Sequence, residues 1–191
     1  WDWSYHDYRD FSINSLVSAS EFFADKGYYV FRMGRYQKEK FNLKNSKIID
    51  YANSKLKSDF LDIYLIANSD FYFGSDSGLK TIAITFMKPC YGVNWSPTLL
   101  YSDPGLFINS NNQLHPWLFI FKRFKCLKTG KKLSLKEILN SEFASACSSK
   151  IFKKNDVCLI DNSSGEIRSL AVEIVKEING EKIESNEDIK M

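Results

Sequence analysis

The residues best suited to binding chemistry form a short loop between two apolar segments. The loop Gly74-Ser75-Asp76-Ser77-Gly78 follows an aromatic run and precedes a segment with helical periodicity. Glycine lets the backbone approach a ligand closely, and the first amides of a helix, here those of Ser77, Gly78 and Leu79, favour an anion. The hydroxyls of Ser75 and Ser77 add two donors. The loop therefore predicts a phosphate site, and the alternative is a tight strand-to-helix turn with Ser and Asp as caps.

Asp76 places a negative charge inside this loop, which disfavours a bare phosphate. Its carboxylate suits the loop if it caps the helix or accepts a hydrogen bond from a sugar or ribose hydroxyl. The stretch has neither the GK[ST] ending of a Walker loop nor the GxGxxG pattern of dinucleotide-binding proteins. These two common phosphate motifs are therefore excluded.

A second polar group, His6 to Asp10, stands directly before the first helical segment. Arginine stays charged and forks onto phosphate oxygens, so Arg9 could clamp a diphosphate or a carboxylate. Asp10 could cap the helix. His6 is a candidate catalytic base, although a hydrogen-bonded loop histidine is the favoured interpretation, and the catalytic residue stays unknown.

A charge also interrupts an apolar strand pattern. Arg32 lies in the run 28–33, just ahead of Gly34, where the loop at the carboxyl end of a strand would begin. Burying an unpaired charge is costly. We therefore expect the Arg32 guanidinium either to reach a ligand crevice or to pair with an acid, and the sequence favours neither.

Two periodicities alternate along the first half of the chain. Helical spacing of apolar residues occurs in the segments 12–26, 59–68 and 79–87. Short aromatic or β-branched runs occupy 28–33, 47–51, 71–73 and 90–93. This alternation predicts βαβ units with right-handed crossovers and a parallel sheet covered by helices on both faces. In such a sheet ligands bind beyond the carboxyl ends of the strands, where the loop 74–78 stands.

The remaining segments are less regular. We expect a loop at 36–46, an irregular connection at 96–113, a strand at 117–121 and a basic segment at 122–132. A short helix is predicted at 133–139, begun by Ser134. The pattern Ser163-x-x-Glu166 has the form of a capping box, and the helix that it starts should end at Gly180.

The composition is that of a folded domain without a strongly charged surface. The 191 residues are 44% hydrophobic and 15% aromatic, which suffices for one substantial core. A formal charge of +3, widely scattered, is too small for a dedicated nucleic-acid binder. No apolar stretch reaches the ~20 residues of a membrane span, and no signal sequence is present, so we expect a cytoplasmic location. The four cysteines stand far apart without a CxxC pair and are expected to be reduced thiols.

Several short stretches occur together in an order that carries a resemblance. They are Arg9-Asp10 before a helix, Gly27 to Gly34, Ile49 to Ala52, Lys57 to Asp62, Phe73 to Gly78, and Pro89 through Asn94 and Trp95. The set resembles a family of bacterial glycosyltransferases from surface-polysaccharide gene clusters, over about residues 5–180. Such proteins resemble GT-B glycosyltransferases, in which two Rossmann-like domains face each other and the C-terminal one holds a nucleotide-sugar donor.

The resemblance implies an α/β fold with a Rossmann-like parallel sheet and helices on both faces, similar to the donor-binding half of a GT-B enzyme. Residues 1–180 would form the nucleotide-sugar-binding domain and 181–191 a frayed tail. An N-terminal acceptor domain would be missing upstream, and the isolated chain is then expected to be inactive in transfer. The implied partners are a nucleotide-sugar donor and a glycan or lipid-linked acceptor, at the inner face of the membrane.

The same resemblance implies roles for individual residues. The loop 74–78 and Leu79 would receive the donor diphosphate, Arg9 would neutralise the charge that grows as the nucleoside diphosphate leaves, and Arg32 would assist. Asp76, Asn94 and Trp95 would contact the nucleoside or the sugar. Electrostatic stabilisation of the leaving group needs neither metal nor cofactor, and neither is expected. No DxD triplet is present, and Asp59-x-x-Asp62 is interpreted as charge at a helix N-terminus.

Two other functions stay open. One keeps the fold and changes the chemistry, as in a pyruvyl transferase or a sugar-nucleotide epimerase of cell-envelope pathways. The other is a noncatalytic interaction module that uses aromatic residues between Trp95 and Phe124. The stretch 117–125, with aromatic and basic residues, could also rest on an anionic membrane surface, but a core strand with a basic exit loop is the favoured interpretation.

Overall fold

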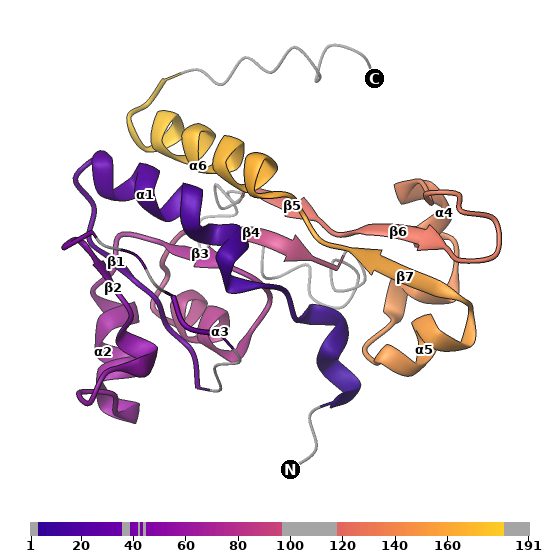
Figure 1. The fold of residues 1–191 in the computed structure, drawn as a ribbon, viewed down its shortest axis with the longest axis horizontal. Coiled ribbons are helices and arrows are strands. Elements are labelled where there is room, and N and C mark those ends of the chain that lie inside the picture. Colours follow the sequence, from indigo (N-terminus) through magenta and orange to yellow (C-terminus); the bar gives the residue numbers. More distant parts are fainter. Residues whose placement is uncertain (1–3, 36–38, 42, 44, 97–117, 182–191) are drawn as a thin grey trace.

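The computed structural model describes residues 4–35, 39–41, 43, 45–96 and 118–181 (Figure 1). The α-helices are α1 Val17–Asp25, α2 Asp59–Ala67, α3 Gly78–Thr85, α4 Leu135–Leu139, α5 Ser149–Lys154 and α6 Ser164–Ile178. The strands are β1 Val30–Phe31, β2 Ile48–Ile49, β3 Tyr72–Gly74, β4 Cys90–Trp95, β5 Phe119–Phe121, β6 Arg123–Cys126 and β7 Val157–Ile160. Short 3₁₀ helices are η1 Ser4–Arg9, η2 Ile13–Leu16, η3 Tyr51–Asn53 and η6 Glu142–Ser145.

The strands form small sheets rather than one continuous sheet (Figure 1). β1 pairs with β2 in parallel, and β3, β4 and β5 form a second parallel sheet. β6 and β7 pair as an antiparallel ribbon. The protein is therefore a mixed α/β structure. The parallel pairing predicted from the alternating half of the chain is found in β1–β2 and β3–β5, whereas β6 and β7, in the later half, are antiparallel.

Helices cover both faces of the central sheet. Tyr91 and Val93 of β4 pack into a core built mainly by α1 and α6, whereas Cys90 packs on the opposite side with residues of α2 and α3. This division follows from the alternation of side chains along a strand. Figure 1 shows α1 and α6 side by side above the sheet and α2 and α3 below it. The predicted covering of both faces is confirmed for this sheet.

Local sequence signals predicted the position of most of these elements. η2 and α1 together occupy the first predicted helix, and α2, α3, α4 and α6 lie where helical spacing placed them. The capping box of α6 is present: the Ser163 hydroxyl accepts from the Glu166 N–H at 3.3 Å, and the Glu166 carboxylate accepts from the Ser163 N–H at 2.8 Å. Gly180 ends the helix with φ +72°.

The region after residue 121 differs from the expectation. The predicted basic exit loop forms β6, and α5 and β7 had not been predicted. Phe124 of β6 is fully buried in a cluster that includes Phe143 and Phe152. Lys122 is also buried, 2.8 Å from the Asp161 carboxylate. The basic residues of this segment led to the prediction of a loop, although it forms a strand in which the buried Phe124 lies between two less buried side chains. The expected connection at 97–113, Trp117 and residues 182–191 lie outside the described residues.

A reciprocal pair of asparagines ties β4 to the start of α6. The Asn94 N–H donates to Asn162 Oδ1, and the Asn162 N–H donates to Asn94 Oδ1, each at 2.6 Å. Asn162 Nδ2 also donates to the Phe121 carbonyl at 2.8 Å. Asn94 takes a left-handed conformation, with φ +55°, which asparagine tolerates better than most residues. Both side chains are buried, so the pair fixes the register of three segments.

Replacing Asn162 by Ala should therefore destabilise the fold. The change leaves the buried Asn94 main-chain N–H and the Phe121 carbonyl without these partners, which should cost about 2–3 kcal/mol of unfolding free energy. Urea denaturation measures the loss. Asn179→Ala, at the exposed end of α6, is the control and should change stability by less than about 0.5 kcal/mol. Equal effects of the two substitutions would contradict the structural role of the pair.

Candidate functional site

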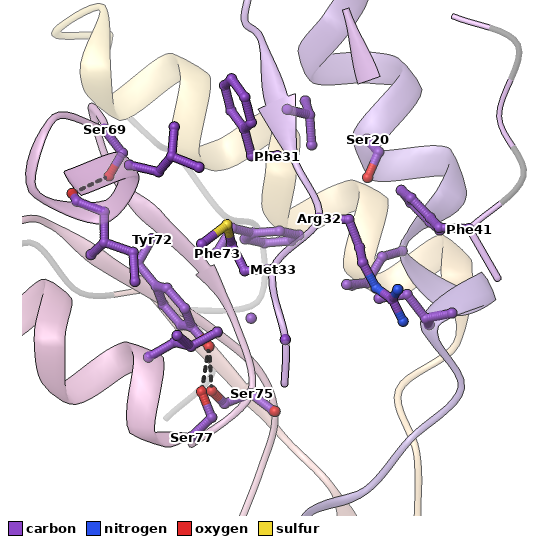
Figure 2. Close-up of a pocket in the computed structure, with 18 of the residues that line it drawn as sticks. Ser20, Phe31, Arg32, Met33, Phe41, Ser69, Tyr72, Phe73, Ser75 and Ser77 are labelled. Carbon is purple, nitrogen blue, oxygen red and sulfur yellow. Dashed lines mark hydrogen bonds between the residues drawn. The ribbon is translucent and has the colours of Figure 1, made fainter. Parts of the chain in front are cut away.

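A cavity of about 1360 Å³ lies between β1 and β3. Its walls come from η1, from β1 with the loop that follows it, and from β3 with the loop 74–78, which we call the elbow. Figure 2 shows Phe31 and Met33 of the β1 segment on the side of Tyr72 and Phe73 of β3, whereas the Arg32 side chain points the other way, toward Phe41. The sequence-predicted residues Arg9, Arg32, His6 and 74–79 all line the cavity, so the structure brings them together.

The elbow leaves a row of main-chain amides available. In the described residues, no acceptor is found for the amides of 75–79, and Ser77, the N-cap of α3, makes no side-chain cap. A Cβ on Gly74 would lie 2.8 Å from the Tyr72 hydroxyl, so the Tyr72 side chain would have to shift to admit it. A Cβ on Gly78 would meet nothing within 4 Å. The amides at the start of α3 are thus available, and the anion site expected there stays a prediction.

The hydrogen bonds of the Tyr72 hydroxyl determine which of the two serine hydroxyls in the elbow can donate to a ligand. Its hydroxyl donates to the Ser75 carbonyl at 2.8 Å and lies 3.1 Å from Ser77 Oγ (Figure 2). Burial raises the pKa of the Tyr72 phenol, which therefore keeps its single proton. Because that proton is used on Ser75, the Ser77 hydroxyl must be the donor to Tyr72. Ser75 is then the serine whose hydroxyl remains available to an anion.

A cluster of charges lies under the elbow. The Asp76 carboxylate pairs with Lys80, one turn later on α3, and lies 3.5 Å from Arg9 Nη1. The Lys80 ammonium stands 4.8 Å from the centre of the Trp95 ring, and the Trp95 indole N–H donates to the Gly74 carbonyl at 3.3 Å. Two cations and one anion leave one positive charge. Asp76 is thus held within the protein, and the sugar or ribose contact assigned to it from the sequence has these competing partners.

The sequence left two alternatives for Arg32, a ligand crevice or an acidic partner, and the structure shows both: Arg32 lines the cavity and pairs with an acid. Its Nη1 lies 3.0 Å from Asp50 Oδ1, and its Nη2 donates to the Glu39 carbonyl at 3.1 Å. Burial raises the pKa of the Asp50 carboxyl, but hydrogen bonds from Asn53 and Arg32 outweigh it, and the net pKa is below the usual value. Arg32 is thus a paired, buried arginine in the cavity wall.

His6 lies in the cavity wall three residues before Arg9. Burial lowers the pKa of its imidazole, the Arg9 guanidinium lowers it further, and Asp76 opposes this in part. The ring is therefore neutral near pH 7, which is the form that a general base requires. Asp7 and Asp10 flank Arg9 and also line the cavity.

Asn94 and Trp95 do not line the cavity. Asn94 is held by Asn162, and Trp95 is only 4% exposed and stacks on Phe119 with ring centres 5.2 Å apart. Both side chains support the sheet and the elbow from inside. Their sequence-based assignment as nucleoside contacts is therefore not retained.

Sequence reasoning missed the support of the elbow. Tyr72, Lys80 and Asp50 were not singled out, although each fixes a predicted site residue. The spacing of Asp76 and Lys80, four residues apart at a helix start, was a usable signal for an ion pair. The contact of Tyr72 with Ser77 had no such signal, because it depends on how the elbow folds back over β3.

Comparisons with known proteins add no assignment. No protein-family model matches the chain, and neither a curated protein nor a solved structure matches it. Within the described ranges, no three His, Cys, Asp or Glu side chains are grouped so that they could hold a metal ion. No helix in that part of the chain has the length and apolarity needed to cross a membrane.

The buried ion pair under the elbow should be strongly coupled. Lys80→Met would leave the Asp76 carboxylate with Arg9 alone, and the loss of a buried partner should cost about 3 kcal/mol of unfolding free energy. Adding Asp76→Asn should restore a large part of it, because the orphan charge is removed. Urea denaturation of the two single variants and the double variant measures the coupling. Additive effects, or an equal loss in the exposed control Lys153→Met, would contradict the pairing.

The His6 side chain should titrate below its usual pKa of 6.5 in the folded protein. The unfolded chain then binds the proton first, so the stability contributed by neutral His6 is complete above pH 6.5 and falls as the pH drops below it. Arg9→Ala should move the pKa upward. Side-chain NMR of His6 against pH tests both statements, and a wild-type pKa at or above 6.5 would refute the first.

Proposed function

We propose that the chain is the donor-binding domain of a glycosyltransferase, which transfers a sugar from a nucleotide-sugar to a cell-surface polysaccharide or glycolipid acceptor. One observation carries the proposal. Arg9 and residues 75–79 line one cavity with aromatic residues in its wall, and the amides of 75–79 and the Ser75 hydroxyl have no partner among the described residues. Such a set suits a ligand that has both a diphosphate and an aromatic base.

The order of the strands supports a Rossmann-like interpretation. From β1 the chain goes to its partner β2, and then to β3, β4 and β5. We infer that β3 lies on the side of β1 away from β2, because the main-chain groups of Val30 and Arg32 bond to the β2 side and the cavity is lined by both β1 and β3. The boundary between β1 and β3 is therefore the place where the direction of winding reverses. In open α/β sheets ligands bind at this boundary, outside the carboxyl ends of the strands. The cavity and the elbow occupy that position, as expected for one half of a GT-B enzyme.

In this function the domain has to bind the donor and stabilise its leaving group. As the sugar leaves, charge grows on the nucleoside diphosphate, and main-chain amides with one guanidinium can stabilise it without reorganisation. Arg9 is well suited because it is 26% exposed in its side chain and only weakly held by Asp76. Asp7 and Asp10 beside it can accept hydrogen bonds from sugar hydroxyls. Apart from the candidate His6, the base for the acceptor is assigned to the other domain.

Acidic residues of the cavity wall oppose anion binding, and distance decides how strongly. Asp70 begins the segment that leads into β3, and four residues of extended chain separate it from Gly74, or about 13 Å. This exceeds the screening length of ~8–10 Å at physiological salt. Glu39 is engaged by Ser12 and Asn14, at 2.7 and 2.9 Å. Asp7 and Asp10 lie beside Arg9, so direct contacts rather than the overall field must hold the phosphate.

An interaction module is the second candidate, and one observation favours it. α2 exposes Phe60, Ile63 and Tyr64 by 72%, 45% and 52% on one face. Such a stripe is unusual on the outside of a helix and suits a protein partner. Trp95 and Phe124, at the two ends of the stretch first expected for this role, are buried, and residues 97–117 between them lie outside the described residues. A chain without affinity for any nucleotide would favour this alternative, and the transferase or epimerase variants would require product analysis.

Arg9→Ala should weaken binding of nucleoside diphosphates about tenfold or more, since a charge-assisted contact is lost. Arg9→Lys should recover part of the affinity as a point charge. Isothermal titration with a panel of nucleoside diphosphates makes the measurement. Arg168→Ala, on α6 and outside the cavity lining, is the charge-matched control. Affinity indifferent to Arg9 would count decisively against a donor diphosphate at the elbow.

The two serines of the elbow should behave differently in the same titration. Ser75→Ala should weaken binding about fivefold, because its hydroxyl is free to donate to phosphate. Ser77→Ala should change affinity by less than about twofold, because its proton is used on Tyr72. The reverse order would mean that the Tyr72 network does not persist in the complex.

A further inference from the structure

The edge of β1 that faces the cavity pairs with no other strand among the described residues. Within the described residues, β1 joins β2, and no ladder links it to β3. Arg32 donates its N–H to the Ile49 carbonyl and accepts from the Ala52 N–H, each at 2.9 Å, so both of its main-chain groups point to the β2 side. Main-chain groups alternate between the two sides of a strand. Those of Phe31 therefore point the other way, toward β3.

The edge of β3 presents the complementary situation. Tyr72 donates its N–H to the Pro89 carbonyl at 2.8 Å, on the β4 side. The main-chain groups of the next residue, Phe73, must then point toward β1. Phe31 and Phe73 both line the cavity, from opposite walls (Figure 2). The slot between them thus offers a main-chain donor and acceptor from each side.

It costs free energy if a ligand buries the main-chain N–H and C=O groups of Phe31 and Phe73 without hydrogen bonds. This cost indicates which kind of ligand suits the slot. An apolar chain in the slot would remove water from them without replacing its hydrogen bonds, at about 1–3 kcal/mol for each group. A nucleobase carries donors and acceptors in the plane of its ring and has apolar faces. Side chains such as Tyr28, Phe41 and Phe71 supply apolar and aromatic surface around the slot. Polar edges with apolar walls therefore match a nucleobase better than a hydrocarbon.

We propose that the facing edges of β1 and β3 bind the nucleobase of the donor through main-chain hydrogen bonds to Phe31 and Phe73. The proposal rests on the donor-binding function above and deepens it, since it places base recognition in the slot. Four residues of extended chain separate Phe73 from Ser77, or about 13 Å at most. Ribose and a diphosphate bridge a separation of this size, so one ligand reaches both slot and elbow.

Replacing Phe31 by Pro tests the β1 edge. Proline removes the N–H that faces the slot and spares the bonds to β2, which Val30 and Arg32 make. Phe31→Ala is the matched control, because it removes the same ring and keeps the N–H. In isothermal titration of the four common nucleoside diphosphates, the tightest should bind about 5- to 10-fold more weakly to Phe31→Pro than to Phe31→Ala. Inorganic pyrophosphate should bind both variants equally.

Amide hydrogen exchange of the unaltered protein gives a second test that does not depend on a variant folding. Exchange of the Phe31 and Phe73 amides should slow with a nucleoside diphosphate and not with pyrophosphate. Unchanged exchange at both amides, or equal affinities of the two folded variants, would overturn the proposal while pyrophosphate binding upheld the elbow. If neither nucleotide nor pyrophosphate binds, the proposed function itself fails.

Discussion

The candidate site depends on a buried carboxylate shared between two cations. Asp76 lies inside the elbow, yet its charge is offset by Lys80 from below and Arg9 from the cavity side. Without Lys80, an acid at this place would repel phosphate and resist burial. With it, the elbow is fixed to α3, and Arg9 is drawn to the point where the amides are free. The same pair thus serves the stability of the turn and the position of the guanidinium.

Residues around the Asp76–Lys80 pair support the elbow. Trp95 and Tyr72 hold the elbow from below through the Gly74 carbonyl and the Ser75 carbonyl. Asn94 and Asn162 fix the strand that carries Trp95. The core between α1, α6 and the sheet in turn holds β4 in place. Trp95, Asn94 and Asn162 are buried, and main-chain and side-chain hydrogen bonds join them to the strands, so this side of the cavity wall is formed before any ligand arrives.

The sequence predicted what is local. Helix periodicity, the capping box at Ser163 and the strand before the elbow depend on residues close in the chain, and the structure agrees with them. Residues 74–79 and Arg9 were assigned to one site, and they line one cavity. The remainder depends on distant pairing. β6 pairs with β7 across more than thirty residues, and the charges of Arg123 and Lys125 on either side of Phe124 concealed the strand pattern. Asn94 and Trp95 were predicted to contact a ligand, but both are buried and lie outside the cavity wall, because burial cannot be read from residue type when a polar side chain has a buried partner.

The indole of Trp95 sits between the ammonium of Lys80 and the ring of Phe119, and it also holds the Gly74 carbonyl. Its excited state is therefore sensitive to any displacement of the loop above it. A shift of Lys80 would alter quenching by the nearby cation, and a broken bond to Gly74 would change the polarity that the indole senses. The fold thus contains an intrinsic fluorophore directly beneath the place where an anion would settle, and its emission can follow occupancy without an added label.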